Sequence, residues 1–469
     1  MRKQLSICAS ILGMLYFAIA QDNHQGKAIE LVQKRPIEWQ HYYDDYDDYD
    51  EIIFDKKSRE IHEEYDKLFF LRFNTMLREV SGRHTVSTEI QTPKTIIEDF
   101  QVNENAGPKG TVQWNPSIAM QESGGTIIVW ADWRNGDWDI YAQRYTAQAT
   151  PLGDNFRVND DENFTAQKYP SVATNSRGNF VVVWTDNREG NRDIYAQRYA
   201  SDGTPIGNNF KVNDDSGSAT QIYPSVGIND SGEIIIAWVD KRNGNWDIYA
   251  QQYDADGNPV GSNFRVNDDS LNAAQKNPSV GIDNYGHCVI VWVDWRNKNS
   301  DIYSQLYTID GLPIGNNFKV NDDTSDANQT SPFLCINGSG RFVVVWADKR
   351  RNGSKIYAQI YSTDGGPLGS NFLVDNDSDF HSESYPSVDI NDSGQFIVAW
   401  EDWRNNNPDI YLQRFTADGV PLGSNFQANI DDGNFDQNYP TIGVGNSGEF
   451  IVAWEDKRND EGDIYAQRF

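Results

Sequence analysis

Between residues 96 and 469, short stretches of alternating apolar and polar residues are separated by turn-forming Gly, Asn and Asp. One such unit shows the pattern: it predicts four strands, at residues 223–228, 233–240 and 247–253 and in a stretch ending at Asn267. Alternation with a period of two is typical of β-strands, and the unit shows no helical period. The pattern therefore predicts four antiparallel strands per unit.

This unit recurs seven times with a constant step of 54 residues, without an insertion or a deletion. The step is carried by the tryptophan of a W-x-D-x-R motif and by a proline in the first strand: Trp130, Trp184, Trp238, Trp292, Trp346, Trp400 and Trp454, and Pro116, Pro170, Pro224, Pro278, Pro332, Pro386 and Pro440. Such regularity indicates one structural unit per copy, stacked on its neighbours. Seven four-stranded units predict an all-β, seven-bladed β-propeller.

The two ends of the repeat region complement each other. The last copy stops at Phe469, after its third strand, while the sequence before the first copy matches the fourth-strand residues 154–159. We therefore expect residues 97–103 to pair with residues 463–469 as the outermost strand of the last blade. An N-terminal strand that completes the last blade would close the ring and protect its sheet edges.

The residues before the propeller divide into two segments. Residues 1–20 begin with Arg2 and Lys3, continue with an apolar run and end on small residues, which predicts a secretory signal peptide. Residues 21–95 form an acidic segment that we expect to be partly disordered. Its Tyr/Asp-rich tract at 41–51 fits a cation- or partner-binding arm or a solvated linker, and residues 51–80 could form a helix. The propeller itself is expected to span 96–469.

Charge and composition limit the classes of partner. The formal net charge of −29 argues against nucleic acid and anionic membranes as partners and favours cations or basic partners, unless it serves solubility alone. No second apolar run is long enough to span a membrane. We expect a soluble, exported monomer, extracellular or periplasmic. Cys288 and Cys335, the two cysteines outside the signal, are interpreted as small buried residues that fill the core, and a disulfide between them is the alternative.

The turn after each second strand carries two acids around an arginine, as in Asp132, Arg134 and Asp139. The pattern faintly resembles a calcium loop, but arginine stands at a ligand position in every copy. We therefore expect an arginine clasp between the two acids. The predicted cofactor set is none, with calcium as the alternative.

A second acidic cluster follows the fourth strand, as in Asn159-Asp160-Asp161. In an up-and-down blade this loop and the second-to-third-strand turn lie at the same end of the ring. Carboxylates and amide oxygens at that density could hold calcium, and turns that cap their own backbone are the simpler interpretation.

Large aromatic residues stand in the polar turns of the same end and form the predicted ligand-binding set: Trp133, Trp138, Trp246, Trp295 and Trp403. Flat rings beside Asp and Asn suit stacking on sugars or anchoring a protein partner. The alternative is that each ring folds back over its own blade.

Signals for catalysis are weak. The sequence holds no nucleophile elbow, P-loop or dinucleotide fingerprint, and His287 and His381 show no metal-binding spacing. A catalytic site on a propeller should break the symmetry locally, and the fifth copy does so at Ser331, Phe333, Cys335 and Lys355.

The motif W-x-D-x-R-N-G-x-x-D-I-Y-A-Q-R-Y, followed by D-G-x-P-x-G-x-N-F-x-V-N, resembles repeats of exported bacterial proteins in the sialidase-like propeller group, mostly of unknown function. The resemblance covers roughly residues 96–469 and implies a secreted propeller. The S-x-D-x-G-x-T-W boxes of true sialidases are absent, and their arginine triad and Tyr/Glu pair cannot be singled out, so no catalytic residue is carried over.

Two functions follow from different classes. Because the blades are nearly identical, we expect a secreted non-catalytic binding or scaffold protein that recognises an extracellular glycan or protein through the loop face. The alternative is a glycan-active hydrolase or lyase with its site at the mouth of the central channel.

Overall fold

The computed structural model describes residues 5–11, 14–20, 93–104, 111–161, 164–269, 273–351, 353–375, 381–430, 435–459 and 462–469. The chain forms two compact units, Met1–Ser87 and Thr88–Phe469. In the first unit, β1 (Leu5–Ile11) pairs antiparallel with β2 (Met14–Ala20). The predicted acidic tract 41–51 and the possible helix 51–80 lie outside the described residues. No helix in the described part of the chain is long and apolar enough to cross a membrane.

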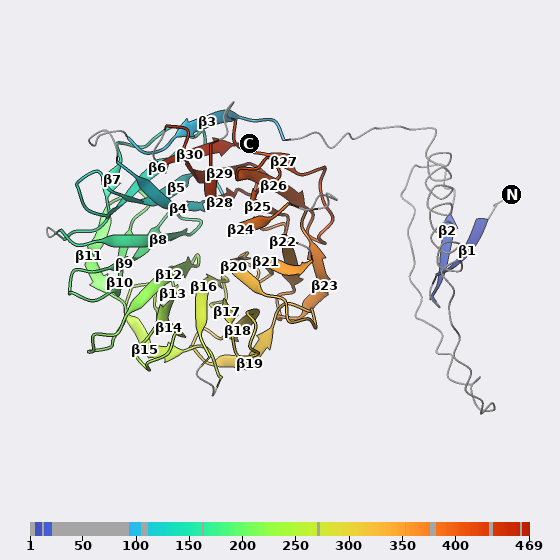
Figure 1. The fold of residues 1–469 in the computed structure, drawn as a ribbon, viewed down its shortest axis with the longest axis horizontal. Coiled ribbons are helices and arrows are strands. Elements are labelled where there is room, and N and C mark those ends of the chain that lie inside the picture. Colours follow the sequence, from blue (N-terminus) through green and yellow to red (C-terminus); the bar gives the residue numbers. More distant parts are fainter. Residues whose placement is uncertain are drawn as a thin grey trace. The chain divides into compact units, whose positions relative to one another are not determined.

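The second unit is the predicted seven-bladed β-propeller: seven four-stranded antiparallel sheets stand around one axis (Figure 1). The first strands, which surround the axis, are β4 (Gln113–Met120), β8 (Gln167–Thr174), β12 (Gln221–Ile228), β16 (Gln275–Ile282), β20 (Gln329–Ile336), β24 (Glu383–Ile390) and β28 (Gln437–Val444). The second strands are β5 (Thr126–Asp132), β9 (Phe180–Asp186), β13 (Ile234–Asp240), β17 (Cys288–Asp294), β21 (Phe342–Arg351), β25 (Phe396–Asp402) and β29 (Phe450–Asp456).

The third strands are β6 (Asp139–Tyr145), β10 (Asp193–Tyr199), β14 (Asp247–Tyr253), β18 (Asp301–Tyr307), β22 (Gly353–Tyr361), β26 (Asp409–Phe415) and β30 (Asp463–Arg468). The fourth strands are β7 (Phe156–Arg157), β11 (Pro205–Lys211), β15 (Pro259–Arg265), β19 (Pro313–Lys319), β23 (Pro367–Leu373), β27 (Phe426–Gln427) and β3 (Ile97–Gln101).

The ring closes through the N-terminal strand, as predicted. β3 pairs antiparallel with β30, with Ile97 opposite Arg468 and Gln101 opposite Tyr465. The seventh sheet therefore has the order β28-β29-β30-β3 (Figure 1). Asn103, just beyond β3, accepts a hydrogen bond from the backbone N–H of Ile464 at 2.8 Å. The closure joins the two ends of the propeller sequence and leaves no blade incomplete.

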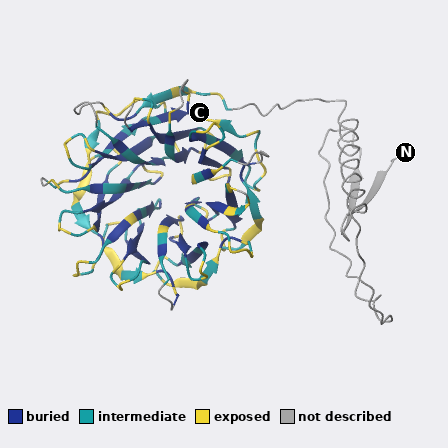
Figure 2. Ribbon diagram, in the orientation of Figure 1, coloured by how far each residue is buried: buried dark blue, intermediate teal, exposed yellow. Residues whose placement is uncertain are grey.

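The core lies between neighbouring blades. The second strands are apolar along their length because both of their faces are covered, and the seven motif tryptophans are fully buried. One cluster joins Val129 of the first blade to Trp184 of the second. Figure 2 shows buried residues on the inner strands and exposed residues on the outer fourth strands. Cys288 and Cys335 are buried and free, which confirms their interpretation as fillers.

One end of the ring collects the features of interest. Gln221, at the start of β12, lies opposite Asp240 at the end of β13, and Asp240 lies opposite Asp247 at the start of β14. The second-to-third-strand turns and the first residues of the inner strands therefore share this end. We call it the turn face.

Candidate active site at the channel mouth

The repeated W-x-D-x-R motif builds the end of each second strand. In the first blade, Nε1 of Trp130 donates to Oδ2 of Asp132 at 2.8 Å, and the backbone N–H of Arg134 donates to Oδ1 at 2.8 Å. The same pair of bonds recurs in the other six blades. A buried carboxylate needs such partners. The motif is therefore structural, and its strict repetition does not mark a site.

The motif arginine does not join the two acids of its own turn, so the predicted clasp is wrong in its third member. In the third blade, Arg242 donates to Asp240 and to Asp214, each at 2.8 Å. Asp214 follows the fourth strand of the second blade, so the arginine ties two blades together. Burial lowers the pKa of Arg242, but the hydrogen bonds to these two carboxylates raise it overall. The expected partner, Asp247, accepts instead from Asn267 at 2.9 Å.

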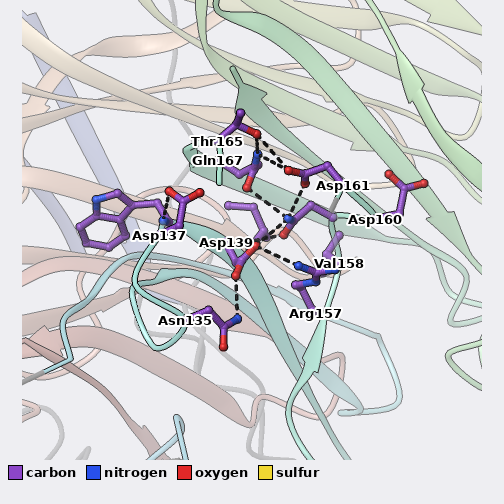
Figure 3. A network of polar contacts seen from close by, with 12 residues as sticks. Asn135, Asp137, Asp139, Arg157, Val158, Asp160, Asp161, Thr165 and Gln167 are labelled. Carbon is purple, nitrogen blue, oxygen red and sulfur yellow. Dashed lines mark hydrogen bonds and ion pairs between the residues drawn. The ribbon is translucent and has the colours of Figure 1, made fainter. Parts of the chain in front are cut away.

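The acidic cluster after each fourth strand bonds to the next blade (Figure 3). Asn159 donates to Asp139 at 2.8 Å and to Gln167, the first residue of β8, at 3.1 Å. Its own oxygen accepts from the backbone N–H of Ile140. At this junction protein donors thus occupy the oxygens that calcium would need, which agrees with the capping interpretation. At the next two junctions, Oδ2 of Asp215 and Oδ2 of Asp269 have no hydrogen-bond partner among the described residues. The expectation of no cofactor, with calcium as its alternative, stays a prediction.

The junction between the fifth and sixth blades breaks this pattern. Lys355, Asp375 and Glu383 stand where the other junctions have Asp, Asn and Gln. Lys355 donates to Glu383 at 2.6 Å and to Asp375 at 3.4 Å. One carboxylate has become an ammonium and two neutral amides have become carboxyls, so the formal charge is unchanged. The substitutions compensate one another, and the junction becomes ionic.

This ionic junction also contains a histidine that sequence spacing could not connect to it. Nε2 of His381 lies 3.3 Å from Asp402 and 3.4 Å from Glu383. Among the described residues, Asp375, His381, Glu383 and Asp402 form the group whose ligand atoms lie close enough together, within 4.8 Å, to hold a metal ion. The Lys355 ammonium, 3.3 Å from His381, already supplies a cation there. Burial, with a hydrogen bond that the protonated carboxyl donates to Asp375, raises the pKa of Glu383 to about 9, and the group reads as a structural ionic junction.

Five aromatic residues form an arc around the mouth of the ring on the turn face; we call Trp114, Tyr169, Tyr223, Tyr385 and Tyr439 the aromatic arc. Their rings meet across blade boundaries: Tyr385 and Tyr439 at 4.8 Å, Trp114 with Tyr439 at 6.3 Å and with Tyr169 at 5.3 Å, and Tyr169 with Tyr223 at 4.5 Å between centroids. Because the first strands surround the axis, contacts between successive first strands trace an arc about it. Flat rings at a concave mouth suit the faces of sugars.

A strained backbone positions four of these rings. The third residue of every first strand has a positive φ, between 47° and 56°, at a register shift: Asn115, Tyr169, Tyr223, Asn277, Ser331, Tyr385 and Tyr439. Left-handed conformations are costly for residues other than glycine and cluster at functional sites. Tyrosine occupies four of the seven positions and smaller side chains the others, so the mouth is asymmetric although the backbone repeats.

Two buried carboxyls stand beside the arc in blades six and seven. Glu401 and Glu455 replace the Ala, Thr or Val of the other blades. Glu401 accepts from the backbone N–H of Tyr439 at 2.8 Å and from the hydroxyl of Ser384 at 2.9 Å. Oε2 of Glu455 has no hydrogen-bond partner among the described residues, although the side chain is only 6% exposed. An unpartnered buried carboxyl oxygen is uncommon and requires an explanation.

The electrostatics of this pair differ from those of surface carboxylates. Burial, reinforced by the charge of Glu401, raises the pKa of Glu455 to about 7. Burial also raises the pKa of Glu401, against its two hydrogen bonds. The phenol of Tyr439 feels both groups: burial first, and then Tyr385, Glu401 and Glu455, raise its pKa. Two carboxyls and a phenol therefore interact at the mouth; near neutral pH the phenol is protonated and Glu455 is about half protonated.

A cavity of about 520 Å³ opens beside the end of the arc. Its wall includes Tyr385 of the arc, Ser384, which bonds Glu401, and Ser331, Lys349 and Arg351 of the fifth blade. The β21–β22 hairpin of this blade is longer than its counterparts. The prediction that the fifth copy breaks the symmetry is confirmed here, and the break lies next to the carboxyl pair.

The five predicted tryptophans lie farther out on the turn face and divide into two groups. Trp133 and Trp403 are exposed. Trp138, Trp246 and Trp295 pack partly against the core, as the alternative expected. The rings of Trp133 and Trp138 are in contact, with centroids 5.3 Å apart, and the ring of Trp138 contacts that of Trp114 in the arc at 6.2 Å. Their role in binding stays a prediction.

Sequence reasoning missed the arc and the carboxyl pair because each depends on departures from the repeat in one or two columns, the tyrosines with Trp114 in the neighbouring column for the arc. The signal was available: Tyr stands before the first-strand Pro in four copies, and Glu stands after the motif Trp only in copies six and seven. A comparison of the copies column by column finds both. Only the closed ring shows that residues from these columns meet at the mouth.

No family model matches the sequence, and no curated protein is similar to it in sequence. The fold is similar to several solved structures. A protein of unknown function from Dyadobacter fermentans is 9% identical, with a TM-score of 0.48, over 80% of this chain and 98% of that chain. The GH93 α-L-arabinofuranosidase of Fusarium graminearum is 9% identical, with a TM-score of 0.46, over 79% and 97%. The polysaccharide lyase Uly1 is 7% identical, with a TM-score of 0.47, over 80% and 99%.

At these identities the similarity concerns the fold. The expectation of a non-catalytic binding or scaffold protein is nevertheless corrected: several of the similar structures are an arabinofuranosidase, an arabinanase and a polysaccharide lyase. These neighbours agree better with the alternative, a glycan-active enzyme. The expectation rested on the near-identity of the blades, and the mouth shows how few substitutions make seven similar blades chemically unequal.

Proposed function

We propose that the chain is an exported glycan-active enzyme, a hydrolase or a lyase, with its site at the mouth of the ring. The observation that carries the proposal is the buried pair Glu401 and Glu455 beside the aromatic arc. Cleavage of a glycosidic bond needs a proton donor and a base or nucleophile held at one place. Carboxyls supply both roles when their surroundings make them unequal.

The two carboxyls are unequal in this way. Glu455, with a pKa of about 7 and an oxygen without a partner, suits donation of a proton to the leaving oxygen. Glu401 is oriented through both oxygens, by the N–H of Tyr439 and the hydroxyl of Ser384, and suits the base. The arc would hold the sugar by stacking, with Tyr439 beside the two carboxyls. In a lyase, the base would instead remove the proton beside a sugar carboxylate, and the acid would again protonate the leaving oxygen.

The test is a screen of neutral and anionic polysaccharides with the wild type, Glu401→Gln and Glu455→Gln. Each variant should lose activity by about 100-fold or more, the usual contribution of a general acid or base. Glu233→Gln is the matched control, because Glu233 lies in the first-to-second-strand turn, at the other end of the ring, bonded to Asn229. It should retain full activity.

The products separate the two reaction types. Hydrolysis gives a new reducing end and a saturated sugar, whereas elimination gives a product with a carbon–carbon double bond that absorbs in the ultraviolet. Wild-type activity in both glutamine variants, with the fold intact by circular dichroism, would rule out this pair as the site. Export is part of the proposal, and the N-terminal sequence of the secreted protein should begin after residue 20.

A further inference from the structure

The first four blades carry alternating lysines and tryptophans on the turn face. We call Trp138, Lys168, Lys241, Trp246, Lys276 and Trp295 the Lys–Trp belt. The lysine ammonium groups lie over indole rings: Lys168 over Trp138 at 5.0 Å, Lys241 over Trp246 at 5.2 Å, and Lys276 5.9 Å from Trp246 and 6.0 Å from Trp295. One lysine therefore bridges two blades, and the belt is continuous from the third blade to the fourth.

The fold places the belt beside the mouth. The backbone carbonyl of Trp138 accepts the N–H of Gln167, and that of Trp246 accepts the N–H of Gln275, so each ring lies against the first strand of the next blade. Lys168 and Lys276 are the second residues of these strands, β8 and β16. Trp114 of the aromatic arc contacts Trp138, which connects the arc to the belt.

The charge of the belt is unusual in so acidic a chain. On the same face, acids of the loops after the fourth strands are already paired with motif arginines: Asp160 with Arg188 at 2.7 Å, and Asp214 with Arg242 at 2.8 Å. In the part of the chain that the structure describes, Lys168, Lys241 and Lys276 make cation–π contacts and no ion pair. The nearby carboxyl of Asp137, which interacts with Lys168, has its pKa raised, mainly by burial. Local positive charge is therefore left for a ligand.

We infer that the Lys–Trp belt binds an anionic polysaccharide, one that bears carboxylate or sulfate groups, and delivers it to the mouth. Ammonium groups would pair with the anionic groups while indole faces contact the sugar rings. This inference rests on the proposed function and narrows its substrate class. Lys241 lies in the second-to-third-strand turn of the third blade and Lys276 in the first strand of the fourth, so a polymer lying across this boundary would meet both.

The test measures binding without catalysis, with full-length protein carrying Glu455→Gln. Two matched polymer pairs serve as probes: dextran sulfate against dextran, and polygalacturonate against its methyl ester. The charged member of at least one pair should bind more tightly, and its binding should weaken as salt rises. The pair that shows the difference tells whether sulfate or carboxylate is recognised.

Lys241→Gln/Lys276→Gln should weaken binding of the charged polymer by about tenfold, the contribution of two partly exposed charge contacts, and leave the neutral polymer unaffected. Lys94→Gln/Arg177→Gln removes the same charge elsewhere and should bind as before; both of these residues are exposed. An equal loss of affinity in both double variants would show that only net charge matters, and would contradict binding by the belt.

The belt and the proposed function fail in different ways. If binding to the charged polymer depends on the lysines but no polymer is cleaved, the belt is supported and the proposed enzyme is rejected. If cleavage depends on Glu401 and Glu455 but shows no preference for a charged polymer, the proposed enzyme is supported and the belt is rejected.

Discussion

At the scale of the residue, the mouth is set by a handful of side chains that depart from the repeat. Glu455 stands where the first blade has Ala131 and the third has Val239. A carboxyl placed in an apolar position loses its hydration, which favours the neutral form. The same substitution that makes the residue suitable as a proton donor therefore makes the fold sensitive to pH.

We predict that this sensitivity is measurable in the stability of the protein. The pKa of Glu455 is raised from 4.5 to about 7 in the folded state, so the folded protein binds more protons than the unfolded chain between these values. Stability from this group is full below pH 4.5 and is lost as pH rises toward 7 and above, by about 1–3 kcal/mol. Urea unfolding across this range should show a flatter profile for Glu455→Gln. An identical profile in wild type and variant would contradict the pKa assignment.

At the scale of the element, neighbouring blades are joined by hydrogen-bonded side chains as well as by apolar packing. At four blade boundaries, the loop after the fourth strand meets the second-to-third-strand turn of the next blade through the motif arginine. The W-x-D-x-R motif is thus half of an inter-blade joint whose other half lies 28 residues earlier in the chain. Its repetition in these blades reflects four equivalent joints.

The joint predicts a stability effect. Arg242→Ala would leave the buried Asp240 carboxylate with its indole and backbone donors but without its guanidinium, and would release Asp214. We expect a loss of about 2–4 kcal/mol in the free energy of unfolding. Arg265→Ala is the control, because Arg265 is more exposed and lies 3.8 Å from Asp247, so its loss should cost under about 1 kcal/mol. Similar costs for the two variants would contradict the joint.

At the scale of the whole molecule, one N-terminal strand closes the ring. β3 covers the edge of β30, and its neighbour Asn103 bonds Asp463 and Gln113, which places it at the boundary between the last blade and the first. Without this strand the seventh sheet would expose an unpaired edge. The positions of the mouth residues in blades six, seven and one depend on the same closure.

Deletion of residues 96–104 should therefore lower stability by several times the about 1 kcal/mol of a typical single mutation. It should also reduce any glycan cleavage, since Tyr439 and Trp114 lie on either side of the closed boundary. Deletion of residues 41–49 is the control of equal length and should leave the melting curve unchanged. An unchanged melting temperature after the first deletion would contradict closure by β3.

The sequence by itself determined the architecture of this protein. Three features were sufficient to predict seven blades and their closure: a step of 54 residues, an alternation of period two, and the matching sequence segments 96–103 and 154–159. This information is local or strictly periodic, so it can be read along the chain. The fifth-copy irregularity at Ser331 and Lys355 was also visible, because it departs from a known pattern.

Only the tertiary structure decided where the chemistry lies. Spacing in the chain suggested that Arg242 joins Asp240 to Asp247, yet the ring brings Asp214 nearer, from the preceding blade. The arc, the carboxyl pair and the Lys–Trp belt each combine residues from different blades, such as Trp114 and Tyr439 in the arc. Side chains from different blades meet because the sheets stand around one axis, and this proximity leaves no trace in local sequence pattern.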